Sequence, residues 1–219
     1  MRSRDGYGTR QFLRQYPEMS IAPSRSDGIL LTGVFRFSAR TRQGNQIEDS
    51  YQLQIEVPSA FPSRTPKVIE TGRRIPRNGH YHVNPDDTLC LGSPLRLLQL
   101  MSCRPDLIGF AERCLIPYLY AVSTALRDGT GFPSGELAHG EPGIISDYLA
   151  LFGLQTREQV IRTLELLGMK RRIANKAPCP CGCGLRLGRC RFNRTIAKYR
   201  RMASRSWFRG HARNPGAGA

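Results

Sequence analysis

Alternation of apolar and polar residues predicts a group of strands in the first third of the chain. Residues Ile29 to Arg40 are rich in β-branched and aromatic types, and Tyr51 to Val57 alternates strictly between apolar and polar positions. Such alternation is typical of half-buried strands. The turn Gln43-Gly44-Asn45 between them indicates a hairpin. Lys67 to Glu70 is expected to form a third strand.

Helical periodicity is weak before this region and dominant after it. Residues 9–16 predict a short amphipathic helix, and the 3.6-residue pattern returns from Leu95. It continues from Asp106 to Arg127, where Pro117 should kink the helix or split it in two. A further short helix is expected around Ile144–Phe152.

A capping signature marks one more helix. Thr156 followed by Gln159 forms a capping box ahead of an apolar run, and Gly168 supplies a stop. Strands followed by helices predict an α+β fold with an antiparallel sheet. We expect a first domain over 1–150, a helical connector over 151–173, a cysteine-rich module with a basic helix over 174–207 and a disordered tail over 208–219.

Charge separates the body of the chain from its last fifty residues. The net charge is +16, and residues 170–219 hold 14 Lys and Arg but no Asp or Glu. The first 169 residues are therefore nearly neutral. Such asymmetry predicts an electrostatic partner such as nucleic acid, an acidic protein or anionic lipid, or else a solvated tail that only aids solubility. No apolar run is long enough to span a membrane, and a cytoplasmic location is expected.

Cys90 is the first candidate for chemistry. It lies in an irregular stretch, 71–94, with His80, His82 and Asn84 six to ten residues upstream. Imidazoles and an amide near a thiol provide what acyl transfer needs, namely a polarised nucleophile and donors for an oxyanion. Taken alone, such a cysteine is more often structural. The turn residues Asp86 and Asp87 need no catalytic role.

The order of these motifs resembles the ubiquitin-conjugating enzymes over about residues 5–150. Tyr51 to Val68, with its Phe61-Pro62 pair, is similar to the family's strand, Phe-Pro and strand passage. His80-Tyr81-His82 stands where the family has His-Pro-Asn, and Leu89-Cys90-Leu91 resembles the active-site cysteine. His82 replaces the family's Asn, and Asn84 is an alternative substitute.

The resemblance implies a function. Cys90 would carry a protein C-terminus as a thioester and pass it to an amine or another acceptor. The longer stretch before His80 and the Ser134 to Gly143 segment look more like the bacterial branch found in anti-phage operons. That branch implies a protein donor with a free C-terminus, for which a cGAS-like nucleotide synthase is a candidate, and an acceptor protein. A zinc site of His80, His82 and Cys90 is the competing interpretation, although no fourth ligand is evident.

A second cysteine group lies near the end of the sequence. Cys179, Cys181, Cys183 and Cys190 fall within twelve residues, which in a reducing compartment predicts a structural zinc site. The group resembles the short zinc motif of the bacterial secretion ATPase, in which Cys183 would be Ser. Either Cys183 or a folded-back His211 would then complete the ligands. Unliganded thiols are the alternative.

The last segment is both basic and aromatic. Phe192, Ile196, Tyr199 and Met202 recur at helical spacing among Arg and Lys. Such a stripe either packs on its own domain or stacks nucleic-acid bases. A non-enzymatic scaffold of the same fold, with its zinc and basic tail binding nucleic acid or a partner protein, is therefore the rival to the transferase.

Overall fold

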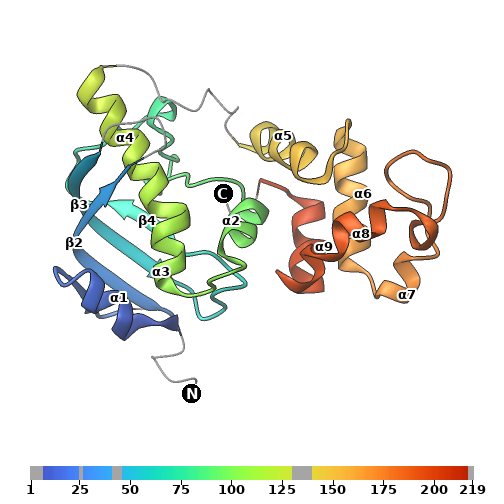
Figure 1. Ribbon diagram of the computed structural model, residues 1–219, viewed down its shortest axis with the longest axis horizontal. Coiled ribbons are helices and arrows are strands. Elements are labelled where there is room, and N and C mark those ends of the chain that lie inside the picture. Colours follow the sequence, from blue (N-terminus) through green and yellow to red (C-terminus); the bar gives the residue numbers. More distant parts are fainter. Residues whose placement is uncertain (1–6, 25–26, 41–45, 130–139, 217–219) are drawn as a thin grey trace. The chain divides into compact units, whose positions relative to one another are not determined.

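The computed structural model describes residues 7–24, 27–40, 46–129 and 140–216 (Figure 1). The chain divides into two compact units. The first unit comprises residues 1–92 and 100–136, and the second comprises 93–99 and 137–219. No helix of the described residues is long and apolar enough to cross a membrane.

The first unit is built on an antiparallel four-stranded sheet in the order β1-β2-β3-β4. The strands are β1 (Met19–Ala22), β2 (Ile29–Ala39), β3 (Ile47–Val57) and β4 (Lys67–Glu70). Phe35 lies opposite Tyr51 in the long β2–β3 pair. The three predicted strands are confirmed, but β3 begins four residues before Tyr51 and β1 was not predicted. The predicted Gln43-Gly44-Asn45 turn lies outside the described residues.

Helices cover one face of this sheet, as Figure 1 shows for α1 (Thr9–Gln15), α3 (Leu107–Phe110) and α4 (Ile116–Asp128). Phe12, Phe35 and Leu119 are fully buried between these layers. A π-helical turn, Ala111–Leu115, joins α3 to α4. Pro117 lies in the first turn of α4, where its missing amide costs little. The expected interruption at Pro117 is thus a widened turn just before it.

The second unit is helical. Its elements are α2 (Pro94–Met101, of which residues 100 and 101 belong to the first unit), α5 (Glu141–Phe152), α6 (Arg157–Gly168), α7 (Arg171–Ala174), a short turn Leu187–Arg189, α8 (Phe192–Ala197), a short turn Tyr199–Arg201 and α9 (Arg205–Arg213). The predicted capping box of Thr156 and Gln159 is present at the start of α6. The unit begins earlier than the predicted connector, because α5 belongs to it.

One expectation is corrected by α9. The segment from 208 onward was expected to be disordered, yet residues 208–213 are helical and packed against α6. Phe208 is fully buried and His211 nearly so. The apolar stripe beginning at Phe192 therefore contributes to a core, as Ile196 and Tyr199 also do, and does not form one exposed basic helix. Residues 217–219 of the predicted tail lie outside the described part of the chain.

Candidate functional site

The loop that carries Cys90 is attached to the edge of β4. The amide of Leu89 donates to the carbonyl of Val68 at 2.7 Å, and Thr88 forms a bridge with Ile69. A second bridge joins Val83 to Leu89. These contacts fold residues 83–89 into a small hairpin. The backbone directly before Cys90 is therefore held in place.

The tip of this hairpin is a hydrogen-bonded turn, as predicted for the two aspartates. The Asn84 amide donates to the Thr88 carbonyl at 2.8 Å, and the Thr88 hydroxyl donates to Asp86 at 2.5 Å. The side-chain amide of Asn84 donates to the Thr88 hydroxyl at 3.0 Å. Asn84 therefore serves the turn, with one of the two hydrogens of its side-chain amide bonded to Thr88.

The structure brings His82 and Cys90 together through their backbones. The Cys90 amide donates to the His82 carbonyl at 2.8 Å. His82 has left-handed backbone angles, φ 53 and ψ 45, after a short turn Gly79–Tyr81. His80 lies in that turn, exposed, with its ring edge-on to Tyr81. His80 is thus held at the surface.

The thiol of Cys90 is half-buried and its environment does not favour the thiolate. Burial raises the pKa of Cys90 above its ordinary value of 9.0, and the backbone amide of Gly92, which donates to the sulfur, opposes that rise. A buried thiol needs a base before it can act as a nucleophile. An activating partner for Cys90 is therefore required by any covalent mechanism.

Three residues beneath the loop were missed by sequence reasoning. Tyr118 on α4 donates its hydroxyl to the Tyr81 carbonyl at 2.7 Å. Glu70 is fully buried at the end of β4, and Arg77 lies 3.6 Å both from its carboxylate and from that of Asp87. A buried carboxylate requires such a counter-charge. The alternation of β4 places Glu70 on the same face as buried Val68, which was the available signal.

The four C-terminal thiols form a compact group. The sulfur atoms of Cys179 and Cys181 lie 3.2 Å apart, and that of Cys190 lies 3.7 Å from Cys181 and 3.5 Å from Cys183. All four sulfurs fall within 4.8 Å of one another. Thiolates around a tetrahedral metal with ~2.3 Å bonds are separated by about 3.8 Å. The spacing therefore fits a four-cysteine metal site.

Backbone amides support the negative charge of this group in a regular way. Amides two residues further along donate to each sulfur: Cys181 to Cys179, Cys183 to Cys181, Leu185 to Cys183 and Phe192 to Cys190. Gly182 and Gly184 adopt positive φ angles of 82 and 74, which glycine tolerates without strain. This is the arrangement that thiolate ligands need.

Neither histidine-containing metal site is formed. The Nε2 atom of His211 lies 2.7 Å from the Tyr148 hydroxyl, buried between α5 and α9, and burial lowers the pKa of His211 to about 4. Cys183 therefore completes the cysteine group. Across the described residues, the group of three or more potential ligands that lies close enough for a metal is that of the four cysteines, so His80, His82 and Cys90 do not form one.

Of the two remaining cysteines, Cys114 is buried in the core and Cys103 is exposed just after the end of α2. Comparisons of the chain with protein-family models, with curated proteins and with solved structures found no match.

Proposed function

We propose that the protein is a cysteine-dependent protein-conjugating transferase, with Cys90 as the carrier of the acyl group. The observation that supports this most is the hydrogen bond from the Cys90 amide to the His82 carbonyl, which holds the backbone of Cys90 against that of the residue that replaces the family's asparagine. The antiparallel sheet followed by helices is compatible with the same family.

The proposed reaction proceeds in two balanced steps. The Cys90 sulfur, after losing its proton to a base, attacks the activated carbonyl of a protein C-terminus, and the activating group leaves. An acceptor amine then attacks the thioester, so that an amide forms and the thiol is regenerated. His82 is the proposed donor to the oxyanion, because it stands at the position of the family's asparagine and its carbonyl accepts the Cys90 amide. A cGAS-like nucleotide synthase is the proposed donor class.

We further propose that the metal of the four-cysteine group is zinc with a structural role. Four thiolates in a tight, amide-supported cluster suit zinc and leave no open position for a substrate. Cys179 is buried and Cys183 is exposed, so the proposed metal site lies at the protein surface. The metal would hold residues 178–190 in place and would take no part in acyl transfer.

The rival function, a scaffold that binds nucleic acid or an acidic partner, is supported by one observation. Of the 14 basic residues from Lys170 onward, 13 are exposed and Arg200 is half-buried. Within the described part of the chain, no ion pair includes any of them. Glu165 is the last residue along the chain that forms one there. Such a surface attracts polyanions.

Mass spectrometry distinguishes the two functions. The protein is copurified from cells that express its genomic neighbours, and a thiol-labile adduct is sought at Cys90. Cys90→Ser should convert the adduct into a reductant-stable ester or abolish it, and Cys90→Ala should abolish it. Cys103→Ala is the matched control, because Cys103 is an exposed thiol in the same unit. Full conjugation by Cys90→Ala would exclude the transferase.

A further inference from the structure

Within the part of the chain that the structure describes, one edge of the sheet is left open halfway along β2. Pairing between β1 and β2 ends where Met19 faces Gly33, and the Val34 amide makes one last bond to the Glu18 carbonyl at 3.2 Å. Amides and carbonyls of alternate residues point to the same side of a strand. The backbone groups of Arg36 and Ser38 therefore face this same edge, beyond the end of β1.

Within the described residues, these backbone groups of Arg36 and Ser38 have no hydrogen-bond partner. The opposite edge of the sheet is treated differently. On β3, Ser50 lies beyond the end of β4, and there its amide donates to Asp49 at 2.8 Å while its carbonyl accepts from Arg74 at 3.0 Å. Side chains thus satisfy the backbone groups at the β3 edge, whereas at the β2 edge the backbone amides and carbonyls can still form hydrogen bonds.

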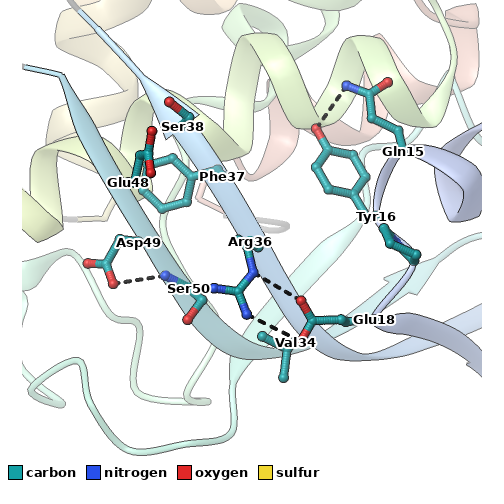
Figure 2. A pocket seen from close by; sticks show the side chains of 11 residues that line it. Gln15, Tyr16, Glu18, Val34, Arg36, Phe37, Ser38, Glu48, Asp49 and Ser50 are labelled. Carbon is teal, nitrogen blue, oxygen red and sulfur yellow. Dashed lines mark hydrogen bonds and ion pairs between the residues drawn. The ribbon is translucent and has the colours of Figure 1, made fainter.

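A hollow of about 600 Å³ runs along this open edge (Figure 2). Figure 2 shows Tyr16 and Glu18 across from the strand that carries Arg36, Phe37 and Ser38. Glu18 and Arg36 pair with each other at the surface at 3.0 Å. The hollow therefore has an unpaired strand edge along one side and an aromatic side chain on the other.

The charge of the lining selects the ligand. Three carboxylates, those of Glu18, Glu48 and Asp49, line the hollow. Glu18 pairs with Arg36 and Asp49 pairs with Arg74, so Glu48 is the carboxylate whose charge is left uncompensated. Glu48 is exposed, and among the described residues no cation pairs with it. It lies beside Ser38 in the β2–β3 register. Because neighbouring strands are about 4.8 Å apart and Ser38 is small, a Lys or Arg on an added strand can reach Glu48.

We propose that this edge binds an extended peptide with basic residues at alternate positions, which adds to β2 as a further strand. The peptide backbone would bond to the amides and carbonyls of Arg36 and Ser38, and strand addition of this kind is an established mode of peptide recognition. Its apolar side chains would face Tyr16, and its basic side chains would face Glu48. This site does not depend on the proposed chemistry of Cys90.

Peptide anisotropy with the full-length protein tests the proposal. The probe is a fluorescein-labelled hexapeptide of alternating Lys and Val. Two versions carry N-methyl groups on opposite sets of alternate amides. One methylated version should bind about tenfold more weakly than the parent, and the other should bind equally, because an added strand bonds through one edge only.

Two substitutions locate the peptide on the protein. Ser38→Pro removes the amide that points away from β3, so the β2–β3 bonds remain and binding should be lost. Ser38→Ala keeps that amide and should bind as the natural chain does. Glu48→Gln should weaken the Lys-Val probe but leave a Thr-Val probe unaffected.

Three results would overturn the proposal. Equal binding of both methylated peptides would exclude strand addition, and so would the absence of binding by the parent probe. Self-association in sedimentation that Ser38→Pro abolishes, without peptide binding, would instead assign the edge to a second copy of this chain. Should Ser38→Pro fail to fold, the methylated pair still decides the matter.

Discussion

Cys90 and Cys183 make the same backbone hydrogen bond but have different surroundings. Each sulfur accepts a hydrogen bond from the amide two residues further along, from Gly92 and Leu185 respectively. The pKa of Cys183, an exposed residue, is lowered to about 7, chiefly by the Leu185 amide. The pKa of half-buried Cys90 is raised, because burial outweighs the amide. One backbone contact therefore leads to opposite protonation preferences.

This difference shows that the groups surrounding a thiol decide its chemistry. Cys183 lies among three other sulfurs that can share a cation, so the amide pattern prepares a ligand set. Among the described residues, Cys90 lies outside any such group. As the proposed acyl carrier it would have to lose its proton before it attacked a carbonyl. In the proposed transferase, a thiol that stays protonated until a base and an acyl donor arrive would be protected from metals and oxidants in the meantime.

Removal of a cluster thiol should produce the largest effect. We expect about one metal ion per chain in the natural protein and none in Cys190→Ser. The substitution should also lower the free energy of unfolding of the second unit by more than ~4 kcal/mol, because binding of the proposed metal would be coupled to folding there. Elemental analysis and urea unfolding measure the two outcomes.

Cys103→Ser is the control for this substitution, since Cys103 is exposed and distant from the cluster in sequence. It should change neither quantity. Retention of metal in Cys190→Ser would mean that three sulfurs suffice, and natural protein without metal under reducing conditions would contradict the site.

The pH dependence of alkylation should separate Cys90 from a preactivated nucleophile. Because its pKa is raised above 9.0, the thiolate is scarce at neutral pH and grows as the pH rises. The iodoacetamide rate at Cys90 should increase about tenfold per pH unit from neutral pH upward, with no plateau below pH 9.0. Peptide mapping by mass spectrometry gives the rate at this one residue. A plateau near neutral pH would show that a neighbouring cation stabilises the thiolate.

Loosening the Cys90 loop should have the smallest effect. Tyr118→Phe removes the hydroxyl that donates to the Tyr81 carbonyl and should lower the free energy of unfolding by about 1 kcal/mol. Cys90 should also be alkylated faster. Tyr7→Phe is the matched control, because Tyr7 donates to the Ser59 carbonyl at an exposed position and should be nearly neutral. Equal effects of the two substitutions would deny Tyr118 any special role in the loop.

Periodicity predicted the elements that bury a regular face. The strict alternation of Tyr51 to Val57 and the capping box at Thr156 are both confirmed in the structure. The four-residue β1 and the basic α9 were missed, because β1 is too short to show a period and because arginines on α9 mask the buried Phe208. Tertiary packing determined both elements.

The candidate sites were predictable to different degrees. The spacing of Cys179 to Cys190 predicted their clustering, since a short loop leaves the thiols few other arrangements. For Cys90, the sequence placed His82 nearby but could not reveal Tyr118 and Arg77. These two residues are separated from Cys90 by 28 and 13 positions in the sequence and meet its loop only through the fold.

The packing of α9 against α6 has a consequence for the order in which parts of this protein can fold during translation. The first unit, which contains the sheet, is complete once residue 136 has emerged from the ribosome, so the loop that carries Cys90 can fold early. The helical unit includes 93–99, which emerge long before their partners, and its core needs Phe208 from α9. Residues 93–99 must therefore wait for most of translation, and a nascent chain stalled before α9 would expose the apolar face of α6 to chaperones.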